Sequence, residues 1–96
     1  MATITKKKII ERIARQTSMH PNEVRMIIQG FLDGITKDLI NGDRIEFRHF
    51  GVFEVVVRKA KVGRNPKRPK IAIMIPEQKG VKFTPGNTLK EKVIKS

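Results

Sequence analysis

Thirteen consecutive residues, 58–70, hold the side chains of this chain that are best suited to binding an anion. Seven of them are Lys or Arg, and none is acidic. Guanidinium and ammonium groups donate strong, charge-assisted hydrogen bonds to phosphate and carboxylate oxygens. The stretch therefore predicts a surface for a polyanion. A nucleic-acid backbone and an anionic membrane both remain open at this point.

The net charge of +12 is also distributed unevenly, with most of it from residue 58 onwards. Residues 1–57 carry 9 basic and 7 acidic side chains, a net of +2, whereas residues 58–96 carry 12 and 2, a net of +10. Such asymmetry favours a polyanion partner for the C-terminal half. The simplest alternative is a solvated and flexible basic loop, which would lack regular patterning on its flanks.

The flanks do have a pattern, because apolar residues alternate there with a period of two, which is typical of β-strands. The alternating residues are Arg44 to Arg48, then Phe53, Val55 and Val57, and, beyond the basic stretch, Ile71, Ile73 and Ile75. The chain is thus expected to turn at His49-Phe50-Gly51, run out, and return as a long β-ribbon. A loop is expected at residues 76–80 and a third core strand at 81–83.

Two helices are predicted before the strands and one after them. Thr5 is suited to cap the first helix, whose apolar face is Ile9, Ile10, Ile13 and Ala14. His20 and Pro21 begin the second helix, with a capping-box Glu23, and Asn41-Gly42-Asp43 ends it. Pro85-Gly86 opens a short last helix. The expected fold is α+β, in one domain of residues 1–96, with a body of 1–57 and 76–96 and an arm of 58–75.

Composition excludes several classes of protein. There is no Cys and there are two His, so we expect no disulfide, metal site, cofactor or small-molecule substrate, and no catalytic constellation marks an enzyme. No apolar run approaches the ~18 residues of a membrane span, and the N-terminus lacks a signal-peptide core, so we expect a cytoplasmic protein. A chain this short needs a stabiliser, and a second subunit is the one that remains.

The residues alone suggest a function for the basic ribbon. A two-stranded ribbon is narrow and has too few apolar positions to act as a packing element. We interpret it as an arm that follows a DNA groove, with its cations on phosphates and groove edges. Pro66 could shape the turn at its tip, because its φ is fixed, or could act as a wedge in a base step.

Three motifs along nearly the whole chain carry a resemblance to a known family. They are His49-Phe50-Gly51-Val52-Phe53-Glu54-Val55, Gly63-Arg64-Asn65-Pro66 and Phe83-Thr84-Pro85-Gly86-Asn87-Thr88-Leu89-Lys90. In order and spacing the chain resembles the bacterial histone-like protein HU and integration host factor (IHF) family. The resemblance implies an intertwined dimer, a homodimer or a heterodimer with a close paralogue, whose arms embrace double-stranded DNA in the minor groove. It also implies a place in the bacterial nucleoid.

The resemblance assigns roles to individual residues. Pro66 matches the intercalating proline of the family, and Arg64 and Asn65 match its groove contacts at the arm tip. The cationic flank of the arm corresponds to Arg58, Lys59, Lys61, Lys67, Arg68 and Lys70. Contacts from the body are expected at Thr5, Lys6, Lys82, Gly86, Asn87 and Lys90, partly because helix starts favour phosphates. The expected dimer core is Phe31, Phe47, Phe50 and Phe53.

Glu46 and Arg48 lie two residues apart in the predicted first strand, so they should point to one face. They could be a solvated pair. The segment Arg44-Ile45-Glu46-Phe47-Arg48 is also similar to a strand of integration host factor subunits, which implies that some sequence preference is possible.

The chain departs from the family pattern in two places. His49 stands where the family usually has Gly, and Lys67-Arg68-Pro69 replaces the usual Thr-Gly, in a tip about one residue longer. The tip turn and the register of Lys70 are therefore open.

The leading hypothesis is a nucleoid-associated protein that bends and compacts duplex DNA largely without sequence specificity. An integration-host-factor-like architectural factor with preferred sites is the alternative. A basic protein that binds anionic membranes is a third hypothesis, which the placement of charge on a ribbon rather than a helix disfavours. Sequence leaves open the identity of the second subunit, any preference for distorted DNA or RNA, and the genes affected.

Overall fold

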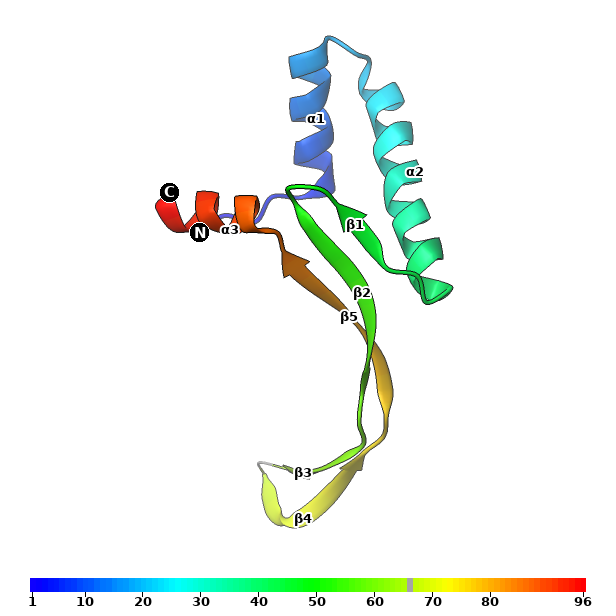
Figure 1. The fold of residues 1–96 in the computed structure, drawn as a ribbon, viewed down its shortest axis with the longest axis vertical. Helices are drawn as coiled ribbons and strands as arrows, with labels where there is room; N and C mark the ends of the chain where they lie inside the picture. The colour runs from blue at the N-terminus through cyan, green and yellow to red at the C-terminus, as the bar shows by residue number, and fades with distance from the viewer. Residues whose placement is uncertain (66) are drawn as a thin grey trace. The chain divides into compact units, whose positions relative to one another are not determined.

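The structure, a computed structural model, describes the backbone of residues 1–65 and 67–96, and their side chains apart from residues 64, 65, 68, 69 and 71. The chain divides into two compact units, Met1–Lys37 and Asp38–Ser96, and each is described by itself. We call the first the helical hairpin and the second the sheet unit (Figure 1).

The helical hairpin contains α1, Lys6–Thr17, and most of α2, Pro21–Ile40. Thr5 caps α1 as predicted, since its hydroxyl accepts from the Lys8 backbone N–H at 3.4 Å. His20 is also a cap, through its ring: Nδ1 accepts from the Asn22 backbone N–H at 3.1 Å. Pro21 is the first helical residue, where no backbone N–H is needed.

The core of the helical hairpin is small. Among the described residues, Ile10, Ala14 and Val24 are the buried apolar side chains, and Ile13, Met19 and Ile28 pack against them half-buried. This confirms the apolar stripe predicted for α1. The stripe on α2 is wider than α1 can cover, because Ile27 and Phe31 are 61% and 55% exposed.

The sheet unit begins with the last residues of α2, which ends at Ile40, and Gly42 in the following turn has a φ of +84°, which suits the glycine predicted to end the helix. Three antiparallel strands follow in the order β1-β2-β5, with β1 at Ile45–Phe47, β2 at Gly51–Arg58 and β5 at Gln78–Pro85 (Figure 1). β2 pairs with β5 over its whole length, from Gly51 opposite Pro85 to Arg58 opposite Gln78. The three-stranded sheet was predicted.

Two details of the predicted strands are wrong. The loop expected at residues 76–80 is shorter, because β5 already begins at Gln78, where pairing with Arg58 holds a segment whose composition is typical of a loop. The first strand ends at Phe47, so Arg48 lies in the turn and not on the strand beside Glu46.

The predicted ribbon is present as β3, Lys61–Asn65, and β4, Arg68–Ile75, which pair antiparallel with each other. The register runs from Lys61 opposite Ile75 and shifts between Arg64 and Asn65, so that Asn65 lies opposite Arg68. Pro66, the residue predicted to intercalate, lies outside the described residues.

The last helix, α3, spans Asn87–Lys95 and begins at Gly86, as predicted. The Gly86 backbone N–H donates to the Phe50 carbonyl at 2.8 Å, which fixes the helix start to the turn after β1. In that turn His49 has a φ of +66°, a left-handed conformation that glycine adopts more readily than other residues.

Gly51 generates the first prediction, because it is buried where β2 begins. A Cβ on Gly51 would lie 2.6 Å from the Phe83 ring and 2.7 Å from the Thr84 carbonyl oxygen. Gly51→Ala is expected to reduce the free energy of unfolding by about 3 kcal/mol, since the Thr84 backbone cannot move aside. Thermal and denaturant unfolding monitored by circular dichroism measure the change.

Gly80→Ala is the matched control in the same sheet. Its Cβ would lie 3.1 Å from Arg58 Nε, the end of a flexible side chain that can turn away. We expect a change below about 1 kcal/mol. Equal losses for the two variants would contradict the packing described at Gly51.

Candidate nucleic-acid interface

The cations of the ribbon and its base are accessible where their side chains are described. Arg58 at the end of β2, Lys59 in the connection, Lys61 in β3, Lys67 in the turn and Lys70 in β4 are all exposed. Arg64, Asn65 and Arg68 lie on the two strands next to the tip, and their side chains are outside the described part of the chain. The structure thus brings the predicted cationic flank onto one ribbon and its base.

Among the side chains of the ribbon that the structure describes, none is buried. On one face Val62 lies opposite Met74, and the two side chains are 62% and 69% exposed. On the other face a Cβ at Gly63 would lie 2.9 Å from Ile75 Cδ1, so glycine there makes room for the isoleucine side chain. The ribbon is therefore thin enough to enter a groove, and packing does not explain its presence.

The register divides the three-stranded sheet into a polar face and an apolar face. Glu46, Glu54 and Lys82 share the polar face, where Glu54 of β2 lies directly opposite Lys82 of β5. Glu46 and Lys82 are exposed, as a contact surface requires. Glu54 was not among the predicted contact residues, because its position opposite a lysine depends on the pairing of strands that are far apart in the chain.

The starts of α1 and α3, where DNA contacts were expected, differ in whether a side chain caps the helix. At α1, Thr5 is engaged as a cap, and Lys6 Nζ donates to Gln29 Oε1 on α2. At α3, the capping residue Gly86 makes no side-chain hydrogen bond. The α3 start therefore has backbone N–H groups that no capping side chain occupies, which is the arrangement that a phosphate can satisfy. Lys90 is exposed one turn further along the helix.

His49 is connected to the same helix start. Its Nδ1 lies 3.4 Å from Thr88 Oγ1, in the first turn of α3. The Gly86–Phe50 hydrogen bond and this contact together hold the α3 start against the turn between β1 and β2. The predicted body residues Gly86, Asn87 and Lys90 are thus positioned by the sheet rather than by α3 alone.

Four phenylalanines form a cluster on the apolar face of the sheet unit. The ring centroids of Phe53 and Phe83 are 4.7 Å apart, and Phe47 and Phe50 extend the cluster at 6.2 Å from Phe53 and 5.6 Å from Phe83. Three were predicted as core residues. Phe83 was missed in that role, although its place in a period-two strand was a signal for it.

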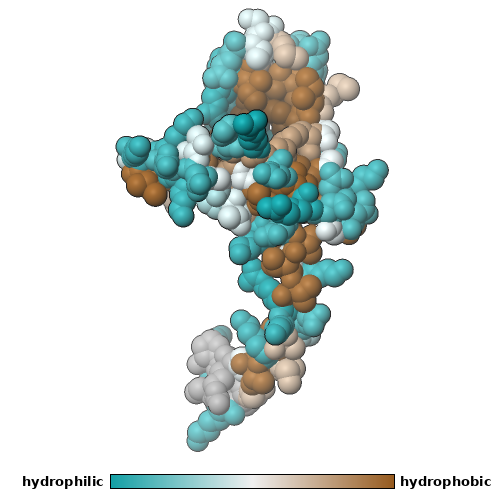
Figure 2. Space-filling view, viewed as in Figure 1, coloured by the Kyte–Doolittle hydropathy of each residue, from teal (hydrophilic) through white to brown (hydrophobic). Residues whose placement is uncertain are grey.

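The cluster is incompletely covered. Phe50 is 47% exposed, and within the described part of residues 38–96 only Gly51 is buried. Figure 2 shows apolar surface on the helices and again along the strands. Phe31, the fourth predicted core residue, lies on the helical hairpin and not in the aromatic cluster.

Two other kinds of site are absent from the described residues. None of their helices combines the length and the hydropathy that a membrane crossing requires. Their His, Asp and Glu side chains form no group of three that could hold a metal ion.

Comparisons with known proteins agree with this geometry. Residues 4–94 match the family described as bacterial DNA-binding protein. A probable DNA-binding protein HU from Chlamydia trachomatis is 57% identical over 90 residues, which cover 94% of this chain and 90% of that protein. The beta subunit of integration host factor from Marinobacter nauticus is 35% identical over 91 residues, covering 94% and 92%.

A solved structure also matches. The fold resembles that of Anabaena HU in a cocrystal with DNA, with a TM-score of 0.85, 29% identity, and coverage of 94% of this chain and 97% of that one. The likeness confirms the α+β fold with three helices and antiparallel sheets.

The exposed cations generate a prediction about salt dependence. Replacing Lys59 and Lys61 together by Ala should weaken binding to every duplex about equally. If each lysine neutralises one phosphate, the slope of log K against log salt should fall in magnitude by about 1.8. Fluorescence anisotropy with a labelled duplex at several salt concentrations measures the slope.

Replacing Lys37 and Lys95 by Ala removes the same charge outside the ribbon and serves as the control. We expect this variant to keep nearly the full slope. An unchanged slope in the ribbon variant would mean that Lys59 and Lys61 make no phosphate contact.

Proposed function

Because the chain belongs to the family of bacterial DNA-binding proteins, we propose that it is a histone-like architectural protein that bends and compacts duplex DNA from the minor groove. The family is not one of enzymes. The observation that carries the proposal is the two-stranded ribbon, whose described side chains are not buried and include the exposed Lys61, Lys67 and Lys70. Such a ribbon is suited to a groove lined by phosphates.

In this mechanism most of the affinity comes from phosphate contacts and from the deformability of the DNA, with few contacts to base edges. Cations of the arm follow the groove, with Arg64 and Asn65 at the tip. Gly86, Asn87 and Lys90 receive phosphates of the bent duplex at the α3 start. The sheet holds this start against its turn, so the phosphate site needs little reorganisation on binding.

Pro66 is the wedge of the proposed mechanism. A pyrrolidine ring without an N–H can enter a base step and leave no donor unpaired among the bases. Unstacking costs a few kcal/mol per step, which wrapping of the DNA onto the protein must offset. The support for this role is the Gly63-Arg64-Asn65-Pro66 sequence at the end of the ribbon.

A site-preferring architectural factor is the second candidate. The similarity to an integration host factor subunit and the exposed Glu46 on the polar face of the sheet favour it. Arg48 lies in the turn after β1 and not beside Glu46 on the strand, which removes the same-strand pair that was the alternative interpretation of these two residues. Affinities for a panel of duplexes of equal length and different sequence distinguish the candidates, since a nonspecific binder gives nearly equal values.

We also propose that the protein works as a dimer, of this chain or of this chain with a close paralogue. The apolar surface left open supports it: Ile27 and Phe31 on α2, and Phe50 and Phe83 in the sheet unit, are 38–61% exposed. A monomer would leave this surface exposed to water, and burying it in an interface would contribute about 25 cal/mol per Å² of apolar area. Each subunit then contributes one body, residues 1–57 and 76–96, and one arm, residues 58–75, and the dimer acts in the bacterial nucleoid.

The dimer generates a prediction on α2. Sedimentation at micromolar concentration should show a dimer for the natural protein. Ile27→Asp should raise its dissociation constant by at least about 100-fold, because the interface would bury an unpaired carboxylate. Thr36→Asp, on the opposite side of α2 by helical spacing, is the control and should sediment as the natural protein does. A folded natural monomer would overturn the dimer proposal.

Pro66 generates the prediction about bending. Pro66→Ala should reduce the bend of an intact duplex and should affect affinity much less on nicked DNA, where unstacking is already cheap. Energy transfer between dyes at the duplex ends measures the bend, and titration on intact and nicked DNA measures affinity. Pro69→Ala, which removes the neighbouring proline in β4, is the matched control and should retain the bend. Equal bending by the natural protein and Pro66→Ala would leave Pro66 as a turn former.

A further inference from the structure

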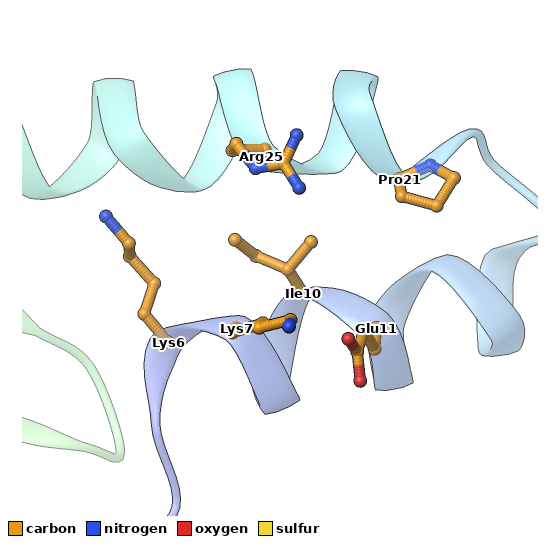
Figure 3. A pocket seen from close by; sticks show the side chains of 6 residues that line it. All are labelled: Lys6, Lys7, Ile10, Glu11, Pro21 and Arg25. Atoms are coloured by element: carbon orange, nitrogen blue, oxygen red, sulfur yellow. The ribbon is translucent and has the colours of Figure 1, made fainter.

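Two adjoining hollows lie along the helical hairpin, and of the residues that line them only Lys6 is among the predicted DNA contacts. The first, of about 370 Å³, is lined by Lys6, Lys7, Ile10, Glu11, Pro21 and Arg25 (Figure 3). The second, of about 340 Å³, is lined by Glu11, Ala14, Arg15, Met19 and Pro21. Because Glu11 and Pro21 line both, we treat the two as one surface and call it the hairpin groove.

The hairpin groove has an apolar floor. Ile10 and Ala14 belong to the core of the hairpin, Met19 packs against that core half-buried, and Pro21 presents its ring at the point where the hollows meet. Figure 3 shows the Ile10 side chain between the two helices, with Arg25 above it on α2 and Lys6 to its left on α1. Contact with this apolar floor does not stabilise a phosphate backbone, whereas it does stabilise apolar side chains of a protein, which are removed from water there.

The rim of the groove is strongly basic. Lys6, Lys7, Arg15 and Arg25 line it, and Glu11 is the one carboxylate among the lining residues. Two of these cations are held by hydrogen bonds, one within α2 and one from α1 to α2. Arg25 donates from Nη1 to Asn22 Oδ1 at 2.6 Å, and Lys6 donates to Gln29 Oε1. A partner that carries acidic groups on both sides of an apolar stripe would match this arrangement.

We propose that the hairpin groove binds an acidic, amphipathic helix of a partner protein. The groove follows α1 from Lys6 to Arg15, a rise of about 14 Å, which a helix of about ten residues spans. Apolar residues at helical spacing would lie on the floor, and flanking carboxylates would face the basic rim. This is the helix-in-groove mode of recognition.

A second copy of this chain is a poor occupant of the groove. α1 and α3 are net basic, and the acidic residues of α2, Glu23, Asp33 and Asp38, are spread over about 22 Å of helix, which is longer than the groove. On α2, Arg25 of the groove and Ile27 of the apolar surface proposed for the dimer are separated by about 160° around the helix, so they lie on different sides of it.

The test uses the full-length protein and a dye-labelled synthetic peptide of about ten residues, with Leu at helical spacing on one face and Glu elsewhere. A peptide of the same composition in permuted order has the same charge but no apolar stripe. By fluorescence anisotropy at about 0.15 M salt, where long-range attraction is screened, we expect the ordered peptide to bind at least about tenfold more tightly than the permuted one. Equal binding would overturn the proposal, since it would reduce the interaction to net charge.

Charge reversals locate the site. Arg25→Glu and Arg15→Glu should each weaken binding of the ordered peptide by about tenfold, because like charges would face each other across the groove. Lys37→Glu changes the net charge equally, lies on α2 outside the groove, and should change binding by less than about twofold. Circular dichroism verifies that each variant is folded. A loss from Lys37→Glu as large as that from Arg25→Glu would contradict the assignment.

Duplex DNA is the other polyanion that this rim could attract, and one more titration separates the two. If the groove serves a protein helix, Arg25→Glu weakens binding of the peptide more than binding of a short duplex. An equal or larger effect on the duplex would place the groove on the path of the DNA and would overturn the proposal. Neither outcome depends on the bending measured with Pro66→Ala, so the groove proposal and the DNA-bending proposal can each be overturned without the other.

Discussion

The pairing of β2 with β5 is the interaction on which the rest of the sheet unit depends. Eight pairs of residues join these strands, from Gly51 opposite Pro85 to Arg58 opposite Gln78. The register places Phe53 against Phe83 on the apolar face, and Glu54 against Lys82 on the polar face. A slip by one residue would exchange the faces of the sheet. At the Arg58–Gln78 end the two paired strands continue towards the ribbon, and at the Gly51–Pro85 end the chain continues into the start of α3.

Charge and apolar burial are separated in this protein. Among the described residues, the buried apolar side chains, which are those of Ile10, Ala14 and Val24, lie in the half of the chain that is nearly neutral. The ribbon carries the charge and has almost nothing to bury. Repulsion between its cations therefore acts on a part of the molecule that contributes little to the folded core, and a polyanion relieves that repulsion when it binds.

Local signals in the sequence were sufficient for the helices and for the outline of the sheet. Thr5, His20 and Pro21 act within a few residues of themselves, so the starts of α1 and α2 could be predicted from chemistry alone. The start of β5 could not, because the Gln78 end of that strand is stabilised by Arg58, twenty positions earlier in the chain. Local composition, rich in Pro, Gly and polar residues, pointed to a loop instead.

For the candidate interface, too, the sequence predicted the local features but not those that depend on strand pairing. Its cations were evident from their density in residues 58–70, since exposed charge needs no tertiary information. The position of Glu54 opposite Lys82 and the contact of Phe83 with Phe53 needed the pairing of distant strands. The assumption that Arg48 shares a face with Glu46 failed because β1 stops one residue earlier than its alternating pattern.

The two-stranded ribbon has one more consequence, which concerns solubility. β3 and β4 pair with each other alone among the described strands, so each has an outer edge whose backbone N–H and C=O groups lack a ladder partner. Such edges are templates on which the strand of another molecule can add, and this is a route to aggregation. Lysines at 61 and 70 place like charges on two approaching ribbons and oppose that contact. The side chains proposed to hold DNA thus also keep the free protein from assembling through its own strands.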